Sequence, residues 1–264
     1  MLRRLFLLIS VVVLSSACVA NAAPVGNIAA PAISKSLFLT TGDGSAVGFI
    51  SGFDANLIFD RKIENTDKAE LNFYTGKLGM TVKDKALFYV LLGGADGKFT
   101  YNVSGSKIEL ETDTAFSWGV GATVILLEKE VNGFGNGILR FGGDLKYRYS
   151  EPDINANNVV VDGVKRDISS VANSSVEYGE FQGAIGVSYQ INKFVPYMGV
   201  KFTKLTGEEK ITVSGTEYKQ DYDADDAVGM FVGADILITD SIALHVEGSL
   251  IDEEAITIGG TIRF

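Results

Sequence analysis

The stretch of sequence that decides the fold is residues 254–264, which read E-A-I-T-I-G-G-T-I-R-F. Successive side chains of a β-strand point to opposite faces, so a strand here has one apolar face and one mixed face. The apolar face carries Ile256, Ile258, Gly260, Ile262 and Phe264. The other face carries Ala255, Thr257, Gly259, Thr261 and Arg263. The pattern predicts a strand that meets a nonpolar medium on one side only and ends on an aromatic residue.

The first residues of the chain predict export. Arg3 and Arg4 precede an apolar or small run at 5–14, which is too short to cross a bilayer as a helix. Ala20-Asn21-Ala22 has the small-x-small form of a cleavage site. We therefore expect a signal peptide at 1–22 and a mature chain that begins at residue 23.

A second cleavage site competes with the first. Leu14-Ser15-Ser16-Ala17-Cys18 is similar to a lipoprotein signal, in which Cys18 would become the lipidated first residue. Cleavage after Ala22 instead leaves a mature chain without cysteine, so that no disulfide holds it together.

Composition excludes several classes of protein. Removing Arg3 and Arg4 with the signal leaves 21 Lys and Arg against 33 Asp and Glu, a net charge of −12 that argues against nucleic acid as a partner. No later segment approaches 18 consecutive apolar residues, yet the mean hydropathy is +0.19. Alternating strands explain both facts, because each strand places its apolar residues at every second position.

Ten strands follow from this two-residue period, at about 47–60, 71–82, 87–92, 114–127, 138–150, 178–191, 196–205, 226–238, 241–251 and 254–264. The clearest is 138–150, where apolar Phe141, Leu145 and Tyr147 alternate with charged residues. The stretch 71–82 mixes its faces, which suggests a β-bulge. The stretch 87–92 is apolar throughout, so its register cannot be read.

The connections between these strands alternate in length. Short turns are expected near 83–85, 128–135, 192–195 and 239–240, and longer loops near 61–68, 96–113, 151–175, 206–224 and 252–253. Such alternation is typical of an up-and-down antiparallel transmembrane β-barrel with both ends of the chain on one side of the membrane. We expect about ten strands over 47–264. Eight or twelve strands remain alternatives, since 97–113 has room for a further hairpin. Residues 23–46 would be a leader or a short plug.

At this point the chain resembles the small outer-membrane β-barrels of Gram-negative bacteria, the OmpA-type barrels in the broad sense. The resemblance lies in the signal at 1–22, the alternating strands, the hairpin 230–250 around Thr239-Asp240-Ser241, and the last strand. It covers about 47–264 and does not include the peptidoglycan-binding domain that some members carry. It implies a place in the outer membrane among lipid and lipopolysaccharide. It also implies that the assembly machinery reads the last strand through Ile256, Ile258, Ile262 and Phe264.

Charged residues fall on the face of the strands that would line the barrel lumen. They are Arg140, Asp144, Lys146, Arg148, Glu180, Lys201, Asp235, His245, Glu247 and Arg263. We expect the three cations of 138–150 to neighbour Glu180, and Asp235, Glu247 and Arg263 to lie on three consecutive strands. Such charges either form a salt-bridged, filled core or line a constriction that selects ions. A barrel of ten strands is close in size to the small barrels whose interior is filled by side chains.

His245, the only histidine, shares its face with Glu247 and Ser249. The three side chains could in principle carry out hydrolysis. Successive side chains on one strand face are about 6.5–7 Å apart, however, which is too far for a triad. We therefore expect no catalysis and no catalytic residue.

No cofactor or metal is expected. Asp221-x-Asp223-x-Asp225 begins like a calcium loop, but Asp226 and Val232 stand where glycine and glutamate are required. Gly97-Lys98 lacks the remainder of a phosphate-binding loop.

Aromatic residues on the outward faces would anchor the barrel at the membrane interface. They are Trp118, Tyr147, Tyr149, Tyr189 and Phe202. The sequence thus predicts a non-catalytic outer-membrane barrel with a structural or surface-contact role, in which the outer loops 96–113, 151–175 and 206–224 would meet any extracellular ligand. A narrow passive pore is the alternative, and an outer-membrane hydrolase is a distant third.

Overall fold

The computed structural model describes residues 24–33, 47–61, 67–103, 106–132, 136–155, 159–166, 174–213, 216–223 and 228–264. The predicted signal peptide, including Cys18, lies outside these ranges. No helix within them is long and apolar enough to cross a membrane.

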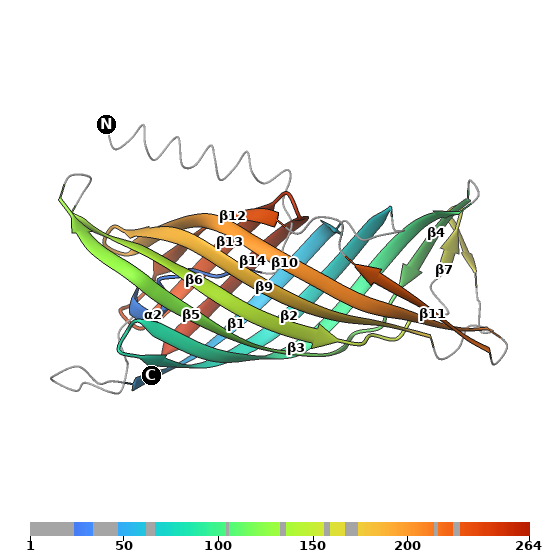
Figure 1. Cartoon of the computed structure of the whole chain (residues 1–264), viewed down its shortest axis with the longest axis horizontal. Coiled ribbons are helices and arrows are strands. Elements are labelled where there is room, and N and C mark those ends of the chain that lie inside the picture. The colour runs from blue at the N-terminus through green and yellow to red at the C-terminus, as the bar shows by residue number, and fades with distance from the viewer. Residues whose placement is uncertain are drawn as a thin grey trace.

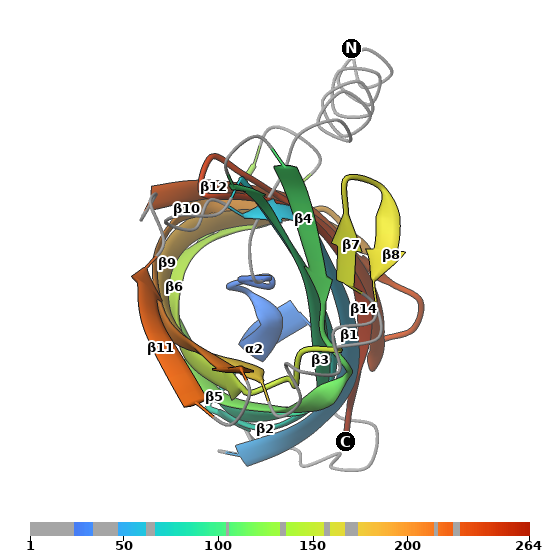
Figure 2. The same ribbon diagram turned by 90° about the vertical axis from the view of Figure 1, so that its right-hand side faces the viewer.

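Ten long antiparallel strands form a closed barrel (Figure 1, Figure 2). In order around the wall they are β1 (Val47–Arg61), β2 (Lys68–Val82), β3 (Ala86–Val103), β5 (Ala115–Val131), β6 (Gly137–Ser150), β9 (Ser175–Gln190), β10 (Phe194–Val213), β12 (Val228–Leu237), β13 (Ile242–Leu250) and β14 (Glu253–Arg263). The first and last strands pair from Ile50 opposite Arg263 to Arg61 opposite Glu253, and this pairing closes the sheet. The predicted all-β fold and the count of ten strands are confirmed.

Four shorter strands lengthen the loops at one end of the barrel. They are β4 (Ser106–Glu111), β7 (Val159–Val161), β8 (Val164–Arg166) and β11 (Thr216–Asp223). β4 pairs with the outer part of β3, and β11 pairs with the outer part of β10. The hairpin suspected at 97–113 therefore exists, but it extends β3 outward and adds no strand to the barrel wall.

The two ends of the barrel differ as predicted. The C-terminus and the short turns share one end, the short-turn end, where Lys83, Asp84 and Asn192 have positive φ, a conformation that tight hairpins use. The opposite end, the long-loop end, carries the four shorter strands (Figure 1). In a membrane barrel the longer loops face the cell exterior.

The outer surface is an apolar belt. Outward side chains such as Leu145, Phe181 and Ile185 are exposed, whereas Asp144, Glu180 and Ala184 beside them are buried in the lumen. The register of β3, unreadable from sequence, places Phe88, Val90 and Leu92 outward and the intervening residues inward. Its inward residues Leu87, Tyr89 and Leu91 carry no charge, so the sequence shows no polar face to mark the lumen.

The bulge expected in 71–82 is not there. β2 pairs with β3 without a shift from Lys68 to Val82. The pairing shifts instead on β1, between Ile58 and Arg61, and again on β5. β2 mixes its faces because inward Leu71 and Phe73 belong to an apolar cluster inside the lumen.

The lumen is filled in layers. Near the long-loop end, buried apolar side chains from many strands meet in one cluster, hereafter the apolar layer. It comprises Ile58, Ala69, Leu71, Phe73, Ala95, Phe99, Ile154, Val176, Tyr178, Leu205 and Ala255. Charged side chains occupy the middle of the lumen. Residues 24–33, which include the short helix α2 (Ala30–Ile33), lie inside the barrel wall (Figure 2) and toward the short-turn end (Figure 1).

The tight turn between β13 and β14 contains a strained residue. Ile251 has φ 90°, a conformation that β-branched side chains rarely adopt. Such strain costs on the order of 1–3 kcal/mol. We expect Ile251→Gly to raise the free energy of unfolding by about 1 kcal/mol in urea titrations of the protein refolded in lipid vesicles.

Ile238→Gly is the matched control for this prediction. Ile238 is similarly exposed and lies in the turn between β12 and β13, but its φ is not positive. Glycine there should lower the free energy of unfolding by roughly 0.5–1 kcal/mol. Equal losses for both variants would show that Ile251 is unstrained.

Candidate functional site

The candidate site is the lumen, and its largest ion network lies just inside the apolar layer. Arg61 on β1 bridges Glu180 on β9 and Glu253 on β14, with Arg61 Nη1 2.9 Å from Glu253 Oε2. Arg148 on β6 contacts the same Glu180, with Nε 2.9 Å from Oε1. The guanidinium of Arg148 also lies 3.6 Å from the ring centroid of Phe73, which joins the network to the apolar layer. All four charged groups are buried. Removal of any one of them would leave a buried charge without a partner, which destabilises the fold.

Lys201 extends the network to the turn before β14. Its Nζ lies 3.1 Å from Asp252 Oδ2 and 3.1 Å from Glu253 Oε1. Thr203 Oγ1 donates to Asp252 at 3.2 Å. The sequence placed the last outer loop at 252–253; the structure places this turn at 251–252, with Glu253 as the first residue of β14. The turn at Ile251 is so tight that both carboxylates face inward, where they neutralise Lys201 and Arg61.

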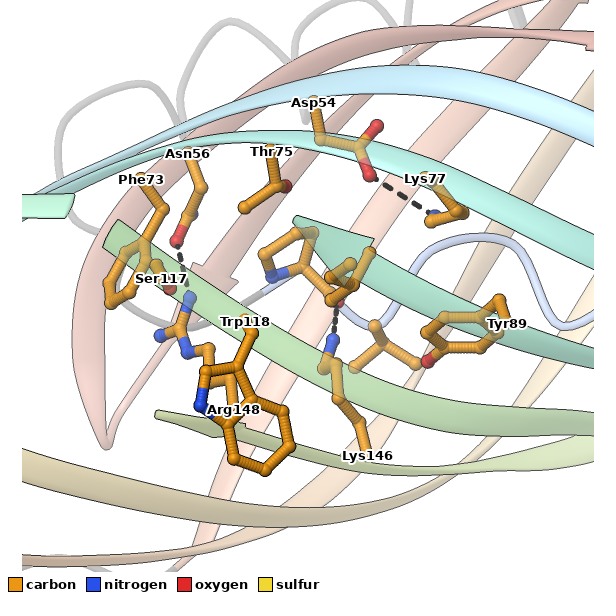
Figure 3. Close-up of a pocket in the computed structure, with 13 residues that line it drawn as sticks. Asp54, Asn56, Phe73, Thr75, Lys77, Tyr89, Ser117, Trp118, Lys146 and Arg148 are labelled. Carbon is orange, nitrogen blue, oxygen red and sulfur yellow. Dashed lines mark hydrogen bonds and ion pairs between the residues drawn. The ribbon is translucent and has the colours of Figure 1, made fainter. Parts of the chain in front are cut away.

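A second group of charges occupies the middle of the lumen. Lys77 Nζ on β2 lies 3.1 Å from Asp54 Oδ2 on β1 (Figure 3). His245 Nε2 lies 3.0 Å from the other oxygen of Asp54, and Nδ1 lies 4.0 Å from Asp235 Oδ1. On the facing wall, Asp144 accepts hydrogen bonds from the Tyr89 hydroxyl at 2.9 Å and from Thr123 Oγ1 at 2.8 Å.

Glycine at position 259 allows Asp54 and His245 to meet. Both residues are register partners of Gly259, one from each neighbouring strand, so their side chains converge over it. A Cβ at position 259 would lie 2.3 Å from Asp54 Oδ1, 2.5 Å from the Phe53 carbonyl oxygen and 2.6 Å from His245 Cε1. The contact therefore requires a residue without a side chain.

His245 does not form the arrangement that hydrolysis needs. Its partners within the described residues are the carboxylates of Asp54 and Asp235. Glu247 instead accepts hydrogen bonds from the backbone N–H groups of Val25 and Gly26, at 2.7 and 2.9 Å. The three residues share a lumen face, as predicted, but His245 bridges acids rather than activating a nucleophile.

Several predicted lumen pairings differ from the structure. Among the three cations of β6, only Arg148 forms an ion pair with Glu180 in the described part of the chain. Arg140 pairs with Glu128 at 2.6 Å, and its Nη1 donates to Gln190 at 2.7 Å. Lys146 donates to the Pro24 carbonyl. The two ends of β6 are too far apart in the lumen for its three cations to share one acid.

Arg263 also lies apart from Asp235 and Glu247. It is at the short-turn end, where its side chain donates to the Pro31 carbonyl at 2.9 Å and to Thr81 Oγ1 at 3.1 Å, and pairs with Asp84. The three residues do lie on consecutive strands, but at different heights in the barrel.

Sequence reasoning missed five members of the two charge groups. Asp54 lies within β1 and was not among the predicted lumen charges. Arg61, Asp252 and Glu253 stand at strand ends that the sequence placed in loops. Lys77 lies on β2, whose faces could not be told apart. Arg61 stands directly opposite Glu253 in the pairing of β1 with β14. This ion pair could have been predicted if the register of that pairing had been known from the sequence.

Little space remains inside the barrel. A cavity of about 20 Å³ lies among residues of both charge groups and the N-terminal segment, including Asp54, Lys77, Tyr89, Lys146 and Arg148 (Figure 3). A second cavity of about 40 Å³ lies beside Asn27, Asp235 and His245. Each holds only one or a few water molecules, so the described lumen is closed.

Four of the five predicted interface aromatics lie in two places, toward the two ends of the barrel. The Trp118 ring lies 5.8 Å from that of Tyr147 and 6.2 Å from that of Tyr149, on the outer face toward the long-loop end. Tyr189 pairs with Leu139 toward the short-turn end and covers Gly137. Phe202 is half exposed on the outer face of β10. Anchoring at two membrane interfaces remains a prediction for these rings.

The hairpin formed by β3 and β4 carries its own charges outside the barrel wall. Glu109 contacts Lys107 Nζ at 2.6 Å and Lys98 Nζ at 2.7 Å. Hydrogen bonds from Lys107 and then Lys98 lower the pKa of the Glu109 carboxyl to about 2. The ionised Glu109 carboxylate therefore stabilises the hairpin fully at pH values above the usual pKa range of glutamate. This stabilisation is lost as the pH falls toward 2.

A closed antiparallel sheet with a continuous apolar outer belt and a polar, packed interior is an outer-membrane β-barrel. The chain is similar in sequence to chlamydial porins. The family model "Chlamydia major outer membrane protein" matches residues 166–215. The major outer membrane porin of serovar L3 of Chlamydia trachomatis is 24% identical over 287 residues, covering 84% of this chain and 64% of that protein. That of Chlamydia muridarum is 28% identical over 132 residues, covering 42% of this chain and 31% of that protein.

This chain thus spans less than two thirds of the length of those curated relatives. Among solved structures, the superposition on the outer membrane protease OmpT of Escherichia coli covers 83% of this chain and 95% of OmpT. The sequence identity is 11% and the TM-score is 0.43. Likeness at that level transfers no activity.

Arg61 provides a test of the larger ion network. Arg61→Met removes the charge shared by Glu180 and Glu253, so we expect the free energy of unfolding to fall by about 3 kcal/mol. Lys68→Met is the control, because Lys68 pairs with Glu70 where both side chains are more than a third exposed, and its loss should cost at most about 0.5 kcal/mol. Urea unfolding in vesicles measures both, and equal effects would contradict the role of Arg61.

Gly259 provides a test of the second charge group. Gly259→Ala forces Asp54 and His245 apart and crowds the Phe53 carbonyl, so we expect a loss of about 2 kcal/mol. At Gly76, on neighbouring β2, an added Cβ would meet nothing closer than 3.5 Å. Gly76→Ala should therefore be neutral or slightly stabilising in the same assay. A neutral Gly259→Ala variant would contradict the close approach.

Proposed function

We propose that the protein is a porin-like channel that passes small polar solutes through the barrel lumen. The observation that carries this proposal is the sequence similarity to chlamydial major outer membrane porins, which extends over 84% of the chain. This similarity favours the narrow pore, which the sequence analysis gave as the alternative, over the structural role, which it gave as the main prediction.

The lumen supplies chemistry suited to such a pore. Arg61, Arg148 and Lys201 alternate with Glu180, Asp252 and Glu253 around its wall. Rings of both signs at a narrow point give ion selectivity. Such a pore is narrow, because the apolar layer and the ion network fill the section near the long-loop end. The described conformation is its closed state.

A structural role is the second candidate. It is favoured by the packing of the described lumen, where the cavities beside the N-terminal segment measure about 20 and 40 Å³. The two candidates differ in one measurable property, the passage of ions.

Catalysis forms no part of the proposal, because His245 faces two acids rather than a nucleophile. As partners we propose outer-membrane lipid and lipopolysaccharide around the apolar belt. The assembly machinery would read the last strand, whose Ile258 and Ile262 are exposed on the outer face.

The pore is tested by single-channel recording of the full chain refolded into planar bilayers. We expect small, discrete conductance steps. Lys201→Met leaves Asp252 and Glu253 with less positive charge beside them, so reversal potentials in a KCl gradient should shift toward cation selectivity. Lys165→Met changes an exposed cation in the loop strand β8 and should leave the reversal potential unchanged.

Folding of each variant is checked by heat-modifiable migration in gels. Protein that is folded and inserted but produces no steps, in the parent chain and in every variant, would overturn the pore and leave the structural role.

A further inference from the structure

The N-terminal segment, residues 24–33, lies inside the barrel and is held by groups of the lumen wall (Figure 2). Val25, Asn27, Ile28 and Ala29 are all at most 5% exposed. The segment pairs with no strand among the described residues. Its departure would therefore break no hydrogen bond of the sheet.

Two oppositely charged wall residues bind the main chain of this segment. The carboxylate of Glu247, on β13, accepts from Val25 N at 2.7 Å through one oxygen and from Gly26 N at 2.9 Å through the other. From β6, Lys146 donates to the Pro24 carbonyl. Charged partners make stronger hydrogen bonds to backbone groups than neutral partners do. Glu247 and Lys146 thus recognise three consecutive residues of an extended peptide.

Beyond these residues the peptide turns. Gly26 has φ +73°, a conformation open to glycine, and Asn27 follows. The Asn27 side chain donates to Asp235 on β12, while its Oδ1 accepts from Ala29 N at 2.9 Å and so starts the single turn of α2. At the far end of that turn, Arg263 Nη1 donates to the Pro31 carbonyl at 2.9 Å.

Apolar contacts complete the fit. Val25 packs with Ala184, Tyr197 and Phe231, from β9, β10 and β12. Further along, Ala29 and Ile33 pack against Val195. On the other side of the lumen, Ala30 packs against the cluster of Ile50, Leu87, Tyr89 and Leu91. The segment therefore contacts much of the circumference, and the two small cavities described above lie beside it.

We propose that the lumen wall is a binding site for the peptide 24–33 of the same chain, and that its occupancy closes the barrel at the short-turn end. Glu247, Lys146, Asp235 and Arg263 form the polar part of the site. The closing role rests on the proposed pore, whereas the binding site does not. If the signal is cleaved after Ala22, as the sequence predicts, the bound peptide lies at the free amino terminus of the mature chain.

The experiment uses a thiol cross-link in the full chain. Asn27→Cys and Asp235→Cys are introduced together, with Cys18→Ser to remove the native thiol, and the refolded protein is treated with a short bifunctional methanethiosulfonate. We expect near-complete cross-linking, detected by mass after proteolysis. The control pairs Asn27→Cys with Thr203→Cys, which the strand register places about 26 Å along the wall from Asp235 and which should not react.

Glu247→Gln in the cross-linking background tests the recognition of the main chain. The amide can accept through one atom only, so one of the two backbone hydrogen bonds is lost. The peptide should leave the wall more often, and we expect the cross-linking rate to fall at least several-fold. In planar bilayers the same substitution should raise the open probability, and the cross-link should abolish opening until a reductant cleaves it.

The outcomes separate the two proposals. Two results in a folded protein would overturn the binding site. In one, the thiol introduced at position 27 fails to link to the thiol at position 235. In the other, it links equally well to the thiol at position 203. Specific cross-linking with conductance that is the same before and after reduction overturns the closing role alone. Specific cross-linking in a protein that never conducts overturns the pore and leaves the binding site in place.

Discussion

The structure depends on the pairing of β1 with β14. In hydrocarbon no water is present to satisfy backbone N–H and C=O groups, so a sheet can cross a membrane only if it has no free edge. The last strand supplies that closure with eleven residues whose alternation is nearly perfect. The same register sets Arg61 opposite Glu253 and brings Asp54 and His245 together over Gly259. Closure of the backbone thus also brings these charged residues of the first and last strands into contact.

The filling of the lumen follows from the number of strands. Ten strands enclose a space only slightly larger than side chains alone can fill. Long charged side chains occupy the middle, where each is matched by partners on other strands or in the N-terminal segment, because an unpaired buried charge is costly. Apolar residues seal the section near the long-loop end. At the short-turn end the wall residues leave room, and the chain fills it with its own N-terminal segment.

Much of this architecture could be predicted from sequence, because a membrane barrel imposes a two-residue period wherever lipid faces one side and polar groups the other. The stretch 138–150 shows that period cleanly, and its faces and boundaries agree with β6. The prediction weakened where the lumen is apolar, as in 71–82 and 87–92, since both faces then look alike.

The contacts between residues inside the lumen were harder to predict from the sequence. The contacts of Arg61 and Glu253 join strands distant in sequence, and only the closed register defines them. Lys77 contacts Asp54 on the neighbouring strand β1, but the mixed faces of 71–82 hid its inward direction. For residues 24–33 the sequence offered a leader or a plug without a choice between them. Their contacts with Glu247 and Lys146 use main-chain atoms, which carry no pattern that a sequence displays.

The length of β10 has a consequence for what the cell exterior meets. A tilted strand crosses the bilayer in about 9–11 residues, whereas β10 contains 20 and is paired with β11 over its outer part. About ten residues therefore stand clear of the membrane, which with a typical tilt is roughly 25 Å of two-stranded ribbon. That height is about three Debye lengths at physiological ionic strength. Charged side chains on its described outer part, such as Glu208 and Lys219, therefore stand outside the bilayer, and an approaching macromolecule encounters them first.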